Sequence, residues 1–241
     1  MPDPSASPTP STRQADARSR VDVADSAVRL FHDQGYEATS ATQIAAAAGV
    51  SRSTFFRQFR SKDDVIFADH DELLIQIDAY FATEPADPWL AVCEAATLVF
   101  ERFRERLEIV RLRDQVVRQT SVLRDRETVM VSRYEKAFSS YLRRQPGVEP
   151  VLAIQFAAAV TATHNFELRR MIRASDSSAL LDAAGLAEEL HVVRTRFTPS
   201  GALQASANRP AAELLVAVFP ASALPADVAR AIELQRHSTA L

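Results

Sequence analysis

Several features that other protein classes require are scarce in this chain of 241 residues. A single cysteine, Cys93, allows no disulfide within the chain and fits a reducing cytoplasm. Five glycines are too few for a sheet with many tight turns, and no alternation typical of strands is sustained. The longest candidate for a membrane span, 214–219, stops at Pro220, and the N-terminus carries no secretory signal. We therefore expect a cytoplasmic protein without membrane contact.

The sequence also lacks the patterns of common catalytic sites. It contains no glycine-rich phosphate loop, no nucleophile elbow and no metal-ligand spacing. The four polar residues 69–72 are consecutive, so on a helix they spread around the axis and cannot all face one ion. We expect no enzyme activity, no cofactor and no metal site. The net charge of −3 excludes a surface coated with basic charge, so any DNA contact must come from a local patch.

Helical periodicity dominates what is present, and it predicts an all-α protein. Residues 1–12, rich in proline, serine and threonine, are expected to be a disordered leader. We predict a DNA-binding domain over 13–62, a helical ligand-binding and dimerisation domain over 63–197, and an extension over 198–241. Outside the two short helices described next, the predicted helices cover about 13–34, 61–81, 89–118 with a break near Arg106, 121–145, 150–174 and 177–197.

Residues 40–59 have the arithmetic of a helix-turn-helix. Ser40 and Gln43 form a capping box at the start of a short helix, and Gly49 permits the positive φ of a tight turn. Ser51 can cap a second helix, whose Phe55 and Phe59 are four residues apart and point inward. A similar capping pair, Ser61 with Asp64, is predicted for the long helix that follows.

The outward face of the second short helix has side chains that suit DNA. Arginine binds guanine edges or phosphates, hydroxyls bind phosphates, and an aromatic ring contacts thymine methyls. Between Arg52 and Lys62 the chain has four basic residues and no acidic one, which indicates an electrostatic footprint on an acidic protein. A helical hairpin inside an ordinary core is the alternative interpretation of this segment.

The same segment resembles the signature of the tetracycline-repressor (TetR) family over about residues 20–66. The matching positions are Leu30-Phe31, Gly35-Tyr36, Ala38-Thr39-Ser40, Ile44-Ala45, Ala48-Gly49-Val50-Ser51, Thr54-Phe55-Phe56-Arg57, Phe59 and Ser61-Lys62. Beyond them, only the number and lengths of the helices agree with the family.

The resemblance implies a role for each DNA-binding candidate. Thr42 and Lys62 would contact phosphate, and Phe56 would lie against the sugar-phosphate wall. The remaining candidates, which would face bases or backbone in the major groove, are Arg52, Ser53, Thr54 and Arg57. Many members have glycine in place of Ser53 and tyrosine in place of Phe56, so the operator or the reliance on arginine is expected to differ.

The resemblance also implies that the second domain binds a small molecule and dimerises through its last two main helices. The helix at 150–174 is apolar nearly all round and rich in alanine, which favours close helix packing, although it could be core only. The candidate pocket residues are Phe100, Phe103, Tyr134, Phe138, Tyr141 and His164. Each of them could instead belong to the core.

Six arginines between 102 and 118 would suit an anionic ligand such as an acyl thioester of coenzyme A. Acidic residues alternate with them, so we expect a solvated, ion-paired face instead. The arginines are Arg102, Arg104, Arg106, Arg111, Arg113 and Arg118.

The function that these features predict is a DNA-binding repressor that acts as a homodimer. A small hydrophobic or amphipathic effector would release it from a palindromic double-stranded operator. A constitutive or protein-regulated DNA-binding factor is the alternative, and a helical enzyme is a remote one.

Overall fold

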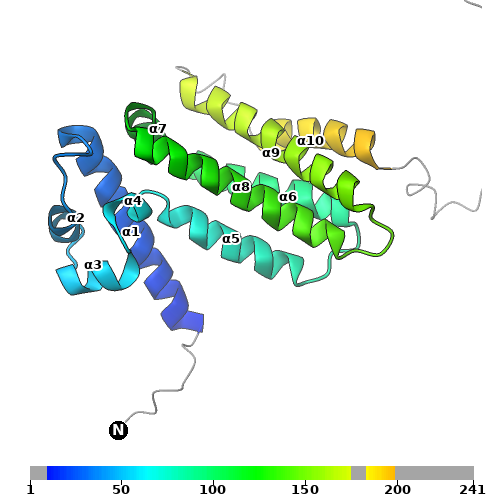
Figure 1. Ribbon diagram of the computed structural model, residues 1–241. Coiled ribbons are helices and arrows are strands. Elements are labelled where there is room, and N and C mark those ends of the chain that lie inside the picture. The colour runs from blue at the N-terminus through cyan, green and yellow to red at the C-terminus, as the bar shows by residue number, and fades with distance from the viewer. Residues whose placement is uncertain (1–9, 175–182, 199–241) are drawn as a thin grey trace, which may run out of the picture. The chain divides into compact units, whose positions relative to one another are not determined.

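The computed structural model describes residues 10–174 and 183–198 (Figure 1). Within these residues the chain forms ten α-helices and no strand. In chain order they are α1 (Pro10–Gln34), α2 (Ala41–Ala47), α3 (Arg52–Gln58), α4 (Lys62–Val65), α5 (Ala68–Phe81), α6 (Pro88–Glu105), α7 (Leu107–Gln119), α8 (Ser121–Arg143), α9 (Pro150–Arg173) and α10 (Ala183–Phe197). The predicted all-α class is confirmed. The helix α1 begins three residues inside the predicted leader, while the extension beyond Thr198 and the predicted start of the last helix at 177 lie outside the described residues.

The apolar face of α1 is buried in the core of the N-terminal helices. Ala24, Ala27, Val28 and Phe31 are all buried, as their spacing predicts. Gly35 follows α1 with a φ of +89°, a left-handed conformation that ends the helix and turns the chain toward α2. In Figure 1, α2 lies beside the C-terminal part of α1, and α3 packs against α2.

The single helix predicted over 61–81 is wrong, because the chain breaks at Ile66 and Phe67, between α4 and α5. The four consecutive residues 65–68 are all buried, with at most 6% of their surface exposed. In a continuous helix these residues would spread about 300° around the axis, so burying all of them on one face is impossible. The break lets each of them reach the core.

The predicted capping pair at the start of this segment is also wrong. The Ser61 side chain makes no capping hydrogen bond, and its hydroxyl is buried without a partner among the described residues. Asp64 instead forms an ion pair with Arg126 of α8, at 3.0 Å. A tertiary charge pair has replaced the local cap.

The predicted break near Arg106 and the predicted cap at Asp87 are confirmed. Arg106 interrupts the helical stretch and separates α6 from α7. Asp87 caps α6 by accepting hydrogen bonds from the backbone N–H groups of Trp89 and Leu90, both at 2.9 Å, with Pro88 at the first helical position.

Two hydrophobic clusters hold the described residues together. One lies among α5, α6, α8, α9 and α10, with Val110 of α7. The other contains buried residues of the four helices α1, α2, α3 and α4. It also contains Ile109, Val116 and Val117 of α7 and Leu123 and Met130 of α8. The N-terminal helices therefore share their core with the second half of the chain. No helix among the described residues is long and apolar enough to cross a membrane.

Candidate DNA-binding surface and ligand cavity

Local hydrogen bonds build both the start of α2 and the turn between α2 and α3. The Ser40 backbone N–H donates to the Gln43 side chain at 2.8 Å, and the Gln43 N–H donates to the Ser40 hydroxyl at 3.2 Å. Gly49 has a φ of +67°, and the Val50 N–H donates to the Ala45 carbonyl at 2.9 Å. The capping box at the start of α2 and the glycine turn after it are confirmed, and the turn sets the angle at which α3 leaves α2.

The helix α3 has one buried side and one exposed side. Phe55 and Phe59 are buried at 0% and 2% exposure, as their spacing predicts. Arg52, Ser53 and Arg57 are exposed. Phe56 is 47% exposed, and the Arg52 guanidinium lies 5.6 Å from the centre of its ring. Because Phe55 and Phe59 bind α3 to the core, its polar side is free to enter a groove.

The hydroxyl groups on α3 are already organised. The Ser51 hydroxyl caps the helix by accepting from the Thr54 N–H at 3.0 Å. It also lies 2.8 Å from the Ser53 hydroxyl and 2.9 Å from the Thr54 hydroxyl. Thr54 is half-buried, so it is less accessible than Ser53, while Thr42 is exposed on α2.

Lys62 has a structural role that the sequence did not reveal. Its Nζ donates to the backbone carbonyls of Tyr36 at 2.8 Å and of Thr39 at 3.3 Å, and lies 4.0 Å from the centre of the Tyr36 ring. The Tyr36 hydroxyl in turn donates to Asp63. These contacts attach the start of α4 to the loop that precedes α2. One N–H of the ammonium group remains for the predicted phosphate contact.

A cavity of about 80 Å³ lies among α5, α6, α7, α8 and α9. Four of the six candidate pocket residues line it: Phe103, Tyr134, Phe138 and His164. Phe100 and Tyr141 do not. Phe100 is fully buried in the core, and Tyr141 stacks on Phe81 with 3.9 Å between ring centres. Helical spacing identifies a buried face, and it does not tell core from cavity.

Beside the cavity, a buried ion pair joins α5 to α7. Arg113 Nη1 donates to both carboxylate oxygens of Asp69, at 2.8 and 2.7 Å, and the two residues are 7% and 5% exposed. Burial, the largest single effect, would raise the pKa of Asp69, but Arg113, His70 and Arg106 together outweigh it and the pKa is lowered. Asp69 is therefore a carboxylate at neutral pH.

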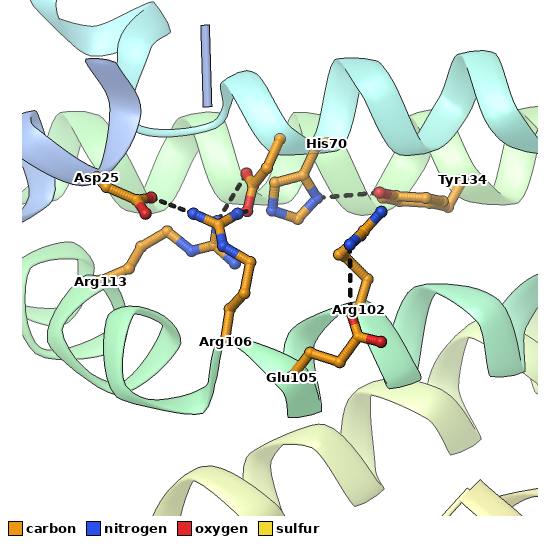
Figure 2. A network of polar contacts seen from close by, with 8 residues as sticks. Asp25, His70, Arg102, Glu105, Arg106, Arg113 and Tyr134 are labelled. Carbon is orange, nitrogen blue, oxygen red and sulfur yellow. Dashed lines mark hydrogen bonds and ion pairs between the residues drawn. The ribbon is translucent and has the colours of Figure 1, made fainter. Parts of the chain in front are cut away.

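Arg106 extends this pair to α1. Its guanidinium donates to Asp69 at 3.4 Å and forms an ion pair with Asp25 of α1. Figure 2 shows Arg106 and Arg113 converging, with Asp25 on one side and His70 and Tyr134 on the other. His70 Nδ1 lies 3.1 Å from the Tyr134 hydroxyl, and burial lowers the His70 pKa to about 3. The network thus connects a wall of the cavity to the first helix.

The expectation of a solvated arginine face is therefore wrong for three of the six arginines. Arg113 is buried, and Arg106 is half-buried between two carboxylates. Arg111 donates to the carbonyls of Ile172 and Ala174, at 3.1 and 2.6 Å, near the end of α9. The acidic partner of Arg113 lies 44 residues away, so the local charge pattern could not reveal it.

The N-terminal part of the chain is similar in sequence to known bacterial regulatory proteins. Residues 23–68, which run from the middle of α1 through α4 to the start of α5, match the family described as bacterial regulatory proteins, tetR family. The chain is 33% identical over 144 residues to the HTH-type transcriptional regulator TcmR of Streptomyces glaucescens, a match covering 58% of this chain and 60% of TcmR. It is 32% identical over 112 residues to the HTH-type transcriptional regulator AcrR of Shigella flexneri, covering 41% of this chain and 51% of AcrR.

These matches span only about half to two thirds of those relatives' lengths. Among solved structures, a complex of SmeT with triclosan superposes with a TM-score of 0.55 at 16% identity, covering 76% of this chain and 93% of the other. That likeness shows that the fold is shared. The match over 23–68 shows that the segment from α1 to the start of α5 is similar to the tetR family of bacterial regulatory proteins.

Proposed function

We propose that this chain is a cytoplasmic transcriptional regulator that binds a palindromic operator as a homodimer. A small hydrophobic or amphipathic molecule in the cavity would release it, so that it acts as a repressor. The observation that carries the proposal is the exposed polar side of α3, which holds Arg52, Ser53 and Arg57.

The charge around α3 supports the DNA-binding role. From Arg52 to Lys62 the chain has no acidic residue, although the whole protein has a net charge of −3. Phosphate oxygens attract such a local basic patch, and the two arginines on the exposed side can donate in pairs to guanine O6 and N7. Phe55 and Phe59 hold the helix rigidly enough for such directional contacts.

A row of apolar residues on α9 supports the dimer. Val151, Ile154, Ala158, Ala162 and Phe166 are spaced three or four residues apart, so they share one side of the helix, and all five are exposed. Phe166 is 63% exposed, more than any other large apolar side chain among the described residues. A second copy that packs its α9 and α10 against these helices would cover this row in a four-helix interface.

The buried network offers a route from the cavity to α3. Phe67 and His70 line the cavity. Phe67 lies at the break between α4 and α5, and His70 lies in the first turn of α5. An engineered apolar cavity that binds benzene has a volume of about 150 Å³. The cavity here, of about 80 Å³, is smaller, so a ring-sized ligand must displace its walls. Such a displacement would move the start of α5, and with it Asp69.

Two contacts would carry that movement onward. Arg106 joins Asp69 to Asp25 of α1, and Lys62 attaches α4 to the loop before α2. Shifting α1 and α4 would change the separation of the two α3 helices in a dimer. Their fit to half-sites about one helical turn apart or somewhat more would then be lost.

A mobility-shift assay on the DNA that flanks the gene tests the DNA-binding role. Arg57→Ala should weaken specific binding by about fivefold to 150-fold, because one arginine contact contributes about 1–3 kcal/mol. Arg143→Ala, which removes an exposed arginine at the end of α8, is the matched control and should bind like the wild type. Equal binding by both variants would contradict the proposed role of α3.

Thermal denaturation with a panel of small molecules tests the effector role. A compound that fills the cavity should raise the melting temperature and weaken operator binding in the same concentration range. A chain that binds its operator but responds to no compound would favour a constitutive or protein-regulated factor.

A further inference from the structure

Two polar atoms at the cavity have no hydrogen-bond partner in the part of the chain that the structure describes. They are the Thr161 hydroxyl oxygen and His164 Nε2, and both are buried. Thr161 and His164 line the cavity, and only 4% and 7% of their surfaces are exposed. They are three residues apart on α9, so their side chains lie on the same side of that helix.

The His164 ring offers a lone pair at Nε2. Its Nδ1 lies 3.3 Å from Oδ1 of Asn165, an amide oxygen that can only accept a hydrogen bond. Nδ1 therefore carries the ring proton, and Nε2 is left as an acceptor. Burial lowers the pKa of His164 to about 4, so the ring is neutral near pH 7. A partner for Nε2 must be a donor, such as O–H or N–H.

The charges around the cavity disfavour an anion. Arg113 lines it, but both of its short contacts go to the Asp69 carboxylate. Asp114 and Glu127 also line the cavity and carry the opposite sign. Burial raises the pKa of Glu127, which shows that a negative charge is already unfavourable there. A carboxylate or phosphate ligand would meet the acidic side chains of Asp114 and Glu127. Arg113, the arginine among the described residues that line the cavity, is already paired with Asp69.

We propose that the ligand of this cavity is neutral and carries a hydroxyl group on an apolar body. The hydroxyl donates its proton to His164 Nε2 and accepts a hydrogen bond from the Thr161 hydroxyl. One oxygen atom thereby satisfies both unpartnered groups, while Val99, Phe103 and Leu168 surround the apolar body. This assignment rests on the proposed function, which makes the cavity the effector site.

The test compares three small ring compounds that differ in one substituent: phenol, toluene and benzoate. Calorimetric titration of the full chain at pH 7 should give a Kd for phenol about tenfold to 100-fold lower than that for toluene, and no binding of benzoate. His164→Phe keeps a ring in place but removes Nε2, and Thr161→Val keeps the shape but removes the hydroxyl. Each variant should abolish most of the preference for phenol.

Thr163→Val is the matched control on the same helix. The Thr163 hydroxyl already donates to the Ala159 carbonyl at 2.9 Å, and Thr163 is not among the residues that line the cavity. This variant should keep the wild-type preference. Because toluene needs no hydrogen bond, its affinity reports whether the variants keep an intact cavity.

Equal affinities of the wild type for phenol and toluene would overturn the proposal, as would tight binding of benzoate or an undiminished preference in both cavity variants. Binding of none of the three compounds would also overturn it. Operator binding, measured on the same preparations without compounds, separates this failure from failure of the proposed function. A chain that shifts its operator but does not prefer phenol refutes the ligand class alone.

Discussion

Removing the charge of Asp69 tests the buried network most sharply. In Asp69→Asn, the Arg113 guanidinium stays 7% exposed but loses the carboxylate that now accepts at 2.8 and 2.7 Å. Breaking a buried pair by removing one partner typically costs about 3–5 kcal/mol. We expect a loss near the lower end, about 3 kcal/mol, because the asparagine oxygen still accepts one hydrogen bond. Arg106 keeps its second partner, Asp25.

Asp71→Asn provides the control, two residues further along α5. The Asp71 carboxylate also contacts two arginines, Arg20 at 3.2 Å and Arg133 at 2.7 Å, but its side chain is 38% exposed. Solvent screens such pairs, so this variant should lose no more than about 1 kcal/mol. The two variants make the same chemical change on the same helix and differ in burial.

Urea unfolding, followed by the fluorescence of the only tryptophan, measures both losses. Trp89 is 8% exposed and packs edge-on against Phe156, so unfolding changes its surroundings completely. All proteins must be compared at one chain concentration, because a dimer gains apparent stability by mass action. The double variant Asp69→Leu with Arg113→Met should lose less than Asp69→Asn, since it leaves no buried charge unpaired. Equal losses in Asp69→Asn and Asp71→Asn would refute the reasoning.

Two further predictions concern pH and local structure. The His164 pKa of about 4 in the folded state lies below its unfolded value of 6.5, so stability falls as pH drops through 6.5. Between pH 7 and pH 5, protonation of His164 in the unfolded state lowers the free energy of unfolding by about 2 kcal/mol. Urea unfolding of His164→Phe at both pH values should show a change in this free energy that is smaller by that amount. An unchanged pH dependence would contradict the assignment. Ser40→Ala removes one half of the capping box and should cost about 1 kcal/mol, with weaker operator binding because α2 positions α3. Its control is Ser132→Ala, at an exposed position on α8. Equal melting temperatures of the two variants would show that the cap is dispensable.

The parts of the fold that follow from neighbouring residues were predictable from the sequence. Ser40 and Gln43 are three residues apart, and the bonds between them need only one turn of helix. Gly49 supplies a conformation that other residues avoid, and Phe55 with Phe59 marks the buried side of α3 by spacing alone. These local signals define the DNA-binding candidate almost completely.

The parts that depend on distant partners were not predictable. Asp69 and Arg113 are 44 residues apart, and nothing near either residue indicates the pairing. The break at Ile66 and Phe67 arises because residues 65–68 are all buried in one cluster with α1, α7 and α8, and those helices are distant in sequence. For the same reason, Phe103 and Phe100 look alike in sequence although only Phe103 lines the cavity.

Hydroxyl-radical footprinting on an operator, taken from the gene's flank or selected from random DNA, tests the central claim most directly. Paired with guanine-methylation interference, it reports which groove the protein reads. We expect two symmetric protected half-sites about one helical turn apart or somewhat more, with interference by N7 methylation in the major groove. At a protein concentration that just saturates the wild-type footprint, Arg57→Ala should give weaker protection. Failure to select any sequence, or a footprint that survives undiminished in Arg57→Ala with no major-groove interference, would contradict the central claim.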